Sequence, residues 1–261
     1  MKKIYFDTNV LSYLRNGSNP ELNARFEQIP SNNIVVFSPA HLEDIAASAM
    51  RDNTDAKIIN EEIEFLHRIA KRNALRPVTR DDVTLYDEAP RDCYNRVIDH
   101  YKNNDYAEEL ESIVIADANR NPVGSPREMN NMAPEDVLAP IGYRELIASH
   151  LSSHGYIAEG EKVASSRWTF EDLKGRFSVF EAYVNLSANI LEKLGYYREK
   201  EEKYRARLHD VSHIIYGAYC DVFVSADKKL VKKARAIYSL LGVPAEAIGL
   251  SEFCSDSEPP R

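Results

Sequence analysis

Acidic residues stand at four places where strands are predicted to end or where helices face those ends: Asp7, Glu43, Asp210 and Asp227. Asp7 directly follows residues 3–6, a short β-favouring run that reads as a first strand, and Asp227 lies one residue beyond a further predicted strand at 222–225. Clustered carboxylates repel each other unless cations neutralise them, and hard oxygen ligands favour Mg²⁺ or Mn²⁺. A metal held in this way activates water and stabilises charge on oxygen. The acids therefore predict hydrolysis of phosphodiester bonds.

Parallel strands are the elements that must bring these acids together. Residues 34–37 form a continuous apolar run between polar, proline-containing segments, which is typical of a strand buried on both faces. A last strand is expected at an edge, at 247–250. Strands alternate with helical patterns at both ends of the chain, which predicts an α/β fold of three layers around a parallel sheet. Since ligands bind beyond the carboxyl ends of such strands, Asp7 and Asp227 are expected to share one edge.

Helical patterns account for most of the remaining chain. Ser38 is a good helix N-cap and Pro39 a good first helical residue, so a helix is expected to begin there. Residues 168–194 are predicted to form one helix ended by Gly195, and the charged residues 197–207 a solvated helical extension. Further helices are expected at residues 10–14, 21–28, 56–71, 206–219 and 228–241, and a further strand at 75–79.

The chain is expected to have three parts. Residues 1–80 and 205–254 carry the strand–helix alternation and the acids, and should fold together as one core. Residues 81–204 are mainly helical with loops and form a large insertion. Residues 255–261 are polar, contain two prolines and are expected to be a disordered tail.

Four motifs accompany the acids in order: Asp7-Thr8-Asn9 after an N-terminal strand, Ser38-Pro39-Ala40-His41-Leu42-Glu43, Asp210 opening a helix, and Phe223-Val224-Ser225-Ala226-Asp227. Together they resemble a PIN domain, the core of a family of nucleases. The resemblance covers residues 1–80 and 205–254. Compact PIN domains, including the toxins of toxin–antitoxin pairs, are much shorter than this chain, so the insertion is a departure from the family and leaves the biological role open.

The resemblance implies a PIN-like fold and a ribonuclease, most simply an endoribonuclease, that depends on Mg²⁺ or Mn²⁺. The metal-binding, catalytic acids of the family match Asp7, Glu43, Asp210 and Asp227. Asn9 and Ser225 match polar positions that support the site in relatives. Asp221, before the strand at 222–225, matches another common family position and is taken as peripheral.

A basic helix is expected beside the acids, with four residues as candidates for contact with nucleic acid: Lys229, Lys232, Lys233 and Arg235. The helix predicted at 228–241 starts at the edge of the acidic cluster, and a helix N-terminus favours anions. Its positive residues are interrupted by apolar ones and are expected to form an exposed face. That face would contact phosphates of RNA, or of single-stranded DNA, or else serve solubility alone.

Two other interpretations remain open. His209 and His213 share a helix face at a spacing of i and i+4, with Asp210 beside them, and this arrangement could hold zinc in a histidine-metal hydrolase. Alternatively, a PIN-like core without catalysis would be a scaffold that binds RNA or protein. Metal-dependent cleavage of RNA and the identity of the metal distinguish the three interpretations.

The composition, 44% hydrophobic and 28% charged, is that of an ordinary globular protein. A net charge of −8 lacks the basic balance of a general nucleic-acid binder, so binding depends on where Lys and Arg lie. Three cysteines without paired spacing fit a reducing cytoplasm. Because there is no signal-peptide pattern and no long apolar run, a cytoplasmic location without membrane contact is expected. The sequence leaves a homo-oligomer or an inhibitory protein partner open.

Overall fold

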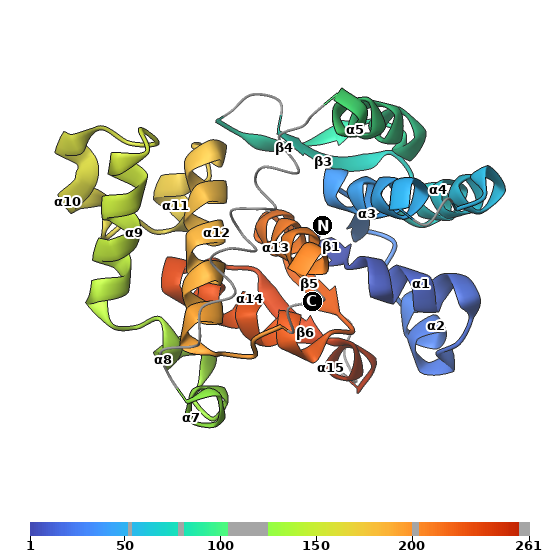
Figure 1. Ribbon diagram of the computed structural model, residues 1–261. Helices are drawn as coiled ribbons and strands as arrows, with labels where there is room; N and C mark the ends of the chain where they lie inside the picture. The colour runs from blue at the N-terminus through green and yellow to red at the C-terminus, as the bar shows by residue number, and fades with distance from the viewer. Residues whose placement is uncertain (52–53, 78–80, 104–124, 200–203, 256–261) are drawn as a thin grey trace.

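The computed structural model describes residues 1–51, 54–77, 81–103, 125–199 and 204–255. At its centre lies a parallel sheet of four strands, in the spatial order β2 (Ile34–Val36), β1 (Lys3–Phe6), β5 (Val222–Ser225) and β6 (Glu246–Gly249) (Figure 1). In the register of β1, Ile4 pairs with Val35 on one side and Val222 on the other. The predicted α/β class and the edge position of the last strand are confirmed. From β1 the chain proceeds to β2 on one side and later to β5 and β6 on the other, so strand order reverses between β1 and β5.

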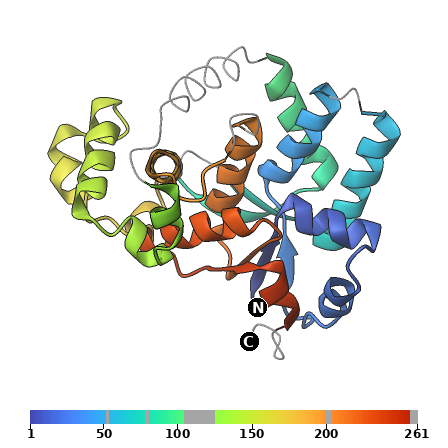
Figure 2. The same cartoon turned by 60° about the horizontal axis from the view of Figure 1, so that its bottom comes forward.

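Alternate residues of each strand point to opposite faces of the sheet, and helices cover both faces (Figure 2). Tyr5 and Phe223 belong to one hydrophobic cluster, with residues of α12 (Phe177–Leu194), α13 (Tyr204–Gly217) and α14 (Lys228–Leu241). Phe6 and Val224 belong to the other, with residues of α1 (Thr8–Asn16), α2 (Pro20–Glu27), α3 (Pro39–Arg51), α4 (Ala56–Ala70) and α15 (Leu250–Ser255). Two apolar layers therefore hold the sheet between helices, as predicted.

The helix after β2 begins at Pro39, as predicted. The amide nitrogen of Ser38 donates a hydrogen bond to Nδ1 of His41 at 3.1 Å, which is half of a capping box. Nε2 of His41 donates in turn to the carbonyl oxygen of Phe6 at 2.7 Å. One buried imidazole thus joins the end of β1 to the first turn of α3.

A glycine allows α13 to lie close to β5 and α14. A Cβ atom on Gly217 would lie 2.7 Å from the hydroxyl of Tyr238 and 2.9 Å from Cγ of Phe223, so a larger residue would force these elements apart. α13 begins at Tyr204, two residues before the predicted start at 206. The prediction that Asp210 lies near the start of its helix is therefore wrong, because Asp210 is the seventh of the 14 residues of α13.

A small hairpin follows α4. β3 (Asn73–Pro77) begins two residues before the strand predicted at 75–79 and pairs antiparallel with β4 (Val83–Asp87). A parallel bridge between Phe37 and Ala74 connects the hairpin to the end of β2. α5 (Pro90–Asn103) packs against α3 and α4, and its Cys93 lies in the same cluster as Phe6. Part of the segment predicted as an insertion therefore packs directly on the core helices.

Residues 125–199 are mainly helical, as predicted. Besides α12, this segment contains α7 (Pro126–Asn130), α8 (Pro134–Val137), α9 (Ile141–Ser153), the 3₁₀ helix η1 (Glu159–Glu161), α10 (Lys162–Ser165) and α11 (Phe170–Leu173). The prediction of one helix over 168–194 is wrong. Asp172 accepts hydrogen bonds from the amide and hydroxyl of Thr169, which caps α11 as a separate helix, and Arg176 leaves the helical conformation (φ −135°, ψ 59°). Gly195 (φ 82°) ends α12 as predicted.

Two predictions fall partly outside the described residues. Of the tail predicted at 255–261, only Ser255 is described, as the last residue of α15. Of the charged extension predicted at 197–207, residues 200–203 lie outside. Within the described segments, no helix is both long and apolar enough to cross a membrane.

Candidate active site

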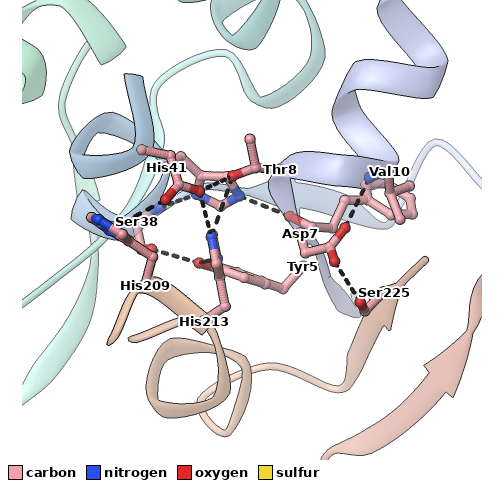
Figure 3. Close-up of polar contacts among 11 residues, drawn as sticks. Tyr5, Asp7, Thr8, Val10, Ser38, His41, His209, His213 and Ser225 are labelled. Atoms are coloured by element: carbon pink, nitrogen blue, oxygen red, sulfur yellow. Dashed lines mark hydrogen bonds and ion pairs between the residues drawn. The ribbon is translucent and has the colours of Figure 1, made fainter. Parts of the chain in front are cut away.

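The carboxyl ends of β1 and β5 lie side by side, and an aspartate follows each. Asp7 caps α1, with its Oδ1 accepting a hydrogen bond from the amide of Val10 at 2.8 Å (Figure 3). Asp227 caps α14, with its Oδ1 accepting from the amide of Lys229 at 2.7 Å. The Ser225 hydroxyl donates to Oδ2 of Asp7 and accepts from the amide of Asp227 at 2.9 Å. The prediction that the two aspartates share one edge of the sheet is confirmed.

Asp7 is buried, with 1% of its surface exposed. Burial raises the pKa of its carboxyl, although hydrogen bonds from Ser225 and Val10 favour the charged form. The negative charge of Asp227 raises this pKa further, whereas His213 opposes the rise. An ionised carboxylate in such a place is costly unless a positive charge compensates for it.

Asp210 reaches the same region from α13. Burial raises the pKa of its carboxyl to about 7, and the charges of Asp227 and Asp44 contribute to the rise. Asp227 thus acts electrostatically on both Asp7 and Asp210. We call these three residues, Asp7, Asp210 and Asp227, the aspartate cluster.

Glu43 faces a different set of charges. Burial raises its pKa to about 7, and the neighbouring Asp44 adds to the rise. The other charges that act most on it are those of His213, Glu181 and Arg96, from α13, α12 and α5. Of the four predicted acids, Asp7, Asp210 and Asp227 are therefore linked through the charge of Asp227, whereas none of these three is among the charges that act most on Glu43.

Asp44, which was not predicted as a site residue, reaches the end of β1. Its carboxylate accepts hydrogen bonds from the hydroxyl of Thr8 and from Nε2 of His213 at 3.0 Å, and Nδ1 of His209 lies 3.3 Å away. Burial alone would raise its pKa, but the hydrogen bond and charge of His213 hold the pKa of Asp44 at about 2. The available signal was the pair of histidines on one helix face, which need an acidic partner when they are buried and charged.

A chain of buried hydrogen bonds continues from Asp44 into the core (Figure 3). His213 is 3% exposed; its Nδ1 lies 2.8 Å from the hydroxyl of Tyr5, which lies 2.7 Å from the hydroxyl of Ser38. Burial alone would lower the pKa of His213, but Asp44 outweighs burial and raises it. His41 is held neutral, because burial and the charge of His213 lower its pKa to about 3. The network fixes β1, α3 and α13 relative to one another.

Of the predicted supporting residues, Ser225 is the one that contacts the cluster. Asn9 is exposed in the first turn of α1. Asp221 precedes β5, and its Oδ2 accepts a hydrogen bond from the amide of Lys3 at 2.7 Å. Because β1 and β5 are parallel, Asp221 lies at the amino end of this strand pair and Asp7 at its carboxyl end.

The predicted basic face of α14 is largely occupied by ion pairs. Lys233 is buried, with 6% of its surface exposed, and its Nζ lies 2.6 Å from Oε1 of Glu192 on α12. Lys229 pairs with Glu199 at 3.2 Å, and Lys233 also lies 3.7 Å from this glutamate. The prediction that Lys233 is exposed is wrong, because α12 packs against α14 and encloses the lysine beside two glutamates.

Arg235 and Lys232 lie in different surroundings on the same helix. Arg235 forms an ion pair with Glu252 at 2.8 Å and donates to the carbonyl oxygen of Ala247 at 2.8 Å. Lys232 is half-buried and forms no ion pair with the described residues, although its charge acts on Glu252 and helps to lower the pKa of that carboxyl. Of the four predicted contacts with nucleic acid, Lys232 is therefore the most available.

The aspartate cluster fits a hard divalent cation by charge and donor type. Within the described segments, no group of three or more His, Cys, Asp or Glu side chains is placed so that it could hold a metal ion. Mg²⁺ keeps several of its waters and is commonly bound by one or two carboxylates, so a partial set of ligands suits it. The zinc interpretation is less well supported, since both ring nitrogens of His213 are engaged and His209 turns to Asp44.

Comparisons with protein-family models, with curated proteins and with solved structures give no match to this chain.

Proposed function

We propose that the protein is a metal-dependent phosphodiester hydrolase with a PIN-like fold, and that it cuts RNA internally. The aspartate cluster is the observation that carries this proposal. Asp7 and Asp227 follow two adjacent parallel strands, where strand order reverses, and the charge of Asp227 raises the pKa of both Asp7 and Asp210. Open α/β sheets bind their ligands at such a reversal.

The aspartate cluster would hold one Mg²⁺ or Mn²⁺, and Glu43 remains the fourth acid that the resemblance to PIN domains assigns to this role. When bound, the ion lowers the pKa of water and stabilises negative charge on phosphate oxygens. The acids favour a cation because burial and mutual repulsion raise the pKa of Asp7 and bring that of Asp210 to about 7. Binding a cation therefore displaces protons from these carboxyls.

Other features of the same edge favour a phosphate group. α1, α3 and α14 all begin there, and the first amides of a helix carry a partial positive charge. Asp44 and His213 hold Thr8, the residue after Asp7, in a fixed position. For the nucleic-acid contact proposed on α14, Lys232 is the leading residue, because Lys229, Lys233 and Arg235 are paired with glutamates.

Cleavage of a fluorescently labelled single-stranded RNA tests the proposal. The wild type should cut the RNA in Mg²⁺ or Mn²⁺ and not in EDTA, and Asp210→Asn should reduce the rate about a hundredfold or more. Asp221→Asn is the matched control, because Asp221 lies at the amino ends of the same strands. This variant should cut RNA at the rate of the wild type. If the wild type binds RNA but cuts neither RNA nor single-stranded DNA in any divalent ion, the protein is the non-catalytic scaffold instead.

A further inference from the structure

A cavity of about 240 Å³ lies between α1, α3 and α4, beside the aspartate cluster. Thr8 and Asp44 line it, and Thr8 directly follows Asp7 of the cluster. The cavity is smaller than the roughly 300 to 1,000 Å³ of sites for drug-sized molecules. A single ring system therefore fits it better than a whole nucleotide.

The walls combine apolar surface with a few hydroxyl groups. Leu11, Ile45 and Phe65 contribute apolar side chains, while Ser12 and Ser48 contribute hydroxyls. The Ser48 hydroxyl lies 3.1 Å from the hydroxyl of Thr54, and the Ser12 hydroxyl accepts from the side-chain amide of Asn16 at 3.5 Å. A hydroxyl has one donor and two acceptor positions, so each keeps capacity for a further hydrogen bond to a ligand. A flat ring with apolar faces and polar edges matches such walls.

The charges of the cavity do not favour an anion. Asp44, Arg15 and Glu62 belong to its lining, and Arg15 is paired with Glu62 at 2.6 Å. With Arg15 and Glu62 neutralising each other, Asp44 leaves the lining negative or, with His213 protonated, neutral. No net positive charge would attract a phosphate there, whereas a neutral heterocycle with N–H donors can bind.

We propose that this cavity binds one nucleobase of a single-stranded RNA, with the adjoining phosphate at the aspartate cluster. The placement of the phosphate rests on the proposed function, but the binding of the base does not. Single-stranded RNA is recognised through bases turned out of the stack, held by aromatic and polar side chains. Ser12 and Ser48 are then the residues that read the edge of the base.

Titration of the protein with each of the four ribonucleosides, followed by NMR of the methyl groups of Leu11, Ile45 and Leu66, tests this proposal. At least one nucleoside should shift these signals, and inorganic phosphate should not. Ser48→Leu places a larger apolar side chain in the cavity and should weaken nucleoside binding at least about tenfold, as expected for lost hydrogen bonds and blocked space. Ser239→Leu, the same change at an exposed position of α14, should leave binding unchanged.

Ser12→Leu provides a second variant on another helix, in case Ser48→Leu fails to fold. The proposal is overturned if no nucleoside shifts the three methyl signals, if phosphate shifts them instead, or if both leucine variants bind as the wild type does. Nucleoside binding requires no cleavage, so its outcome is independent of the proposed activity. If the wild type also cuts RNA, Ser48→Leu should lose the base preference at one position beside the cut while still cutting.

Discussion

The carboxylate of Asp44 holds together side chains from three elements. It accepts hydrogen bonds from Thr8 at the start of α1 and from His213 on α13, while Asp44 itself belongs to α3. Its neighbour Glu43 has the opposite electrostatic situation, since burial and the charge of Asp44 raise its pKa to about 7. Adjacent acids on one helix therefore contribute to stability with opposite signs at neutral pH.

Asp44→Asn should lower the free energy of unfolding by about 2 to 4 kcal/mol at pH 7, because it leaves His213 as a buried charge without its partner. Glu43→Gln, the matched control one residue away, should leave stability unchanged or raise it. Urea unfolding of the three proteins measures this. Equal stability of wild type and Asp44→Asn would show that the ion pair contributes nothing.

The pH dependence of the same variants has a definite sign. The pKa of Asp44 is lowered from 3.8 to about 2, so the stability it contributes is present above pH 4 and is lost as pH falls from about 4 to 2. The pKa of Glu43 is raised from 4.5 to about 7, so stability should decrease as pH rises through that range. Asp44→Asn should flatten the acidic part of the stability profile, and Glu43→Gln the part between 4.5 and 7.

At the scale of elements, local patterns were sufficient for the four strands of the central sheet and for several helix starts, but β3 was predicted two residues late and β4 was not predicted. The runs that form β1, β2, β5 and β6 were located within one residue, because strands buried on both faces have continuous apolar sequence. The prediction of one helix over residues 168–194 failed because α11 and α12 are both helical, and the break between them depends on the local cap at Thr169. Patterns of this kind cannot show which charged residues become enclosed.

The residues of the site divide in the same way, into those that local sequence patterns predict and those that depend on how the helices pack. Asp7 and Asp227 could be predicted because each follows a buried strand, and adjacent parallel strands bring their ends together. Asp44 could not, because successive residues of a helix point about 100° apart and the motif favoured Glu43. The pairing of Lys233 with Glu192 joins residues 41 positions apart, which no local periodicity reports.

Two adjacent lysines of α14, the buried Lys233 and the half-buried Lys232, test whether burial in an ion pair decides the effect of a substitution. Lys233→Ala should destabilise the protein by about 3 to 5 kcal/mol, because it leaves Glu192 buried without a counter-charge. Lys232→Ala should change stability by less than about 0.5 kcal/mol, as is usual at the surface. If Lys232 contacts RNA, its loss should also lower the log–log salt dependence of binding by about 0.7. Similar stability losses in the two variants would contradict the assigned burial.

On the scale of the whole molecule, part of the negative charge is concentrated at the carboxyl ends of β1 and β5. The net charge is −8, and Asp7 and Asp227 lie at the carboxyl ends of β1 and β5, the strands that join the N-terminal and C-terminal segments, while the charge of Asp227 acts on Asp210 as well. Repulsion within the aspartate cluster therefore acts across the interface between these segments, β1 and β5. A bound cation would stabilise the pairing of the two ends of the chain.

Thermal unfolding should reflect this coupling. At pH 7.5 the melting temperature should be higher in Mg²⁺ or Mn²⁺ than in EDTA, and Asp227→Asn should reduce the difference because it removes part of the repulsion. The difference should shrink at pH 5.5, where Asp210, with a pKa of about 7, is mostly protonated. Asp221→Asn should respond to the ions as the wild type does. Coincident melting curves in EDTA and in both ions would contradict the account.

The most direct measurement is X-ray diffraction from crystals soaked in Mn²⁺, with anomalous difference density recorded at the manganese absorption edge. We expect a strong peak within bonding distance of carboxylate oxygens of Asp7, Asp210 or Asp227, and its loss in crystals of Asp210→Asn. A peak on the imidazoles of His209 and His213 would instead support the histidine-metal hydrolase. Occupancy of neither site at Mn²⁺ concentrations at which the protein cuts RNA in solution would contradict the proposal that the aspartate cluster is the metal-dependent active site.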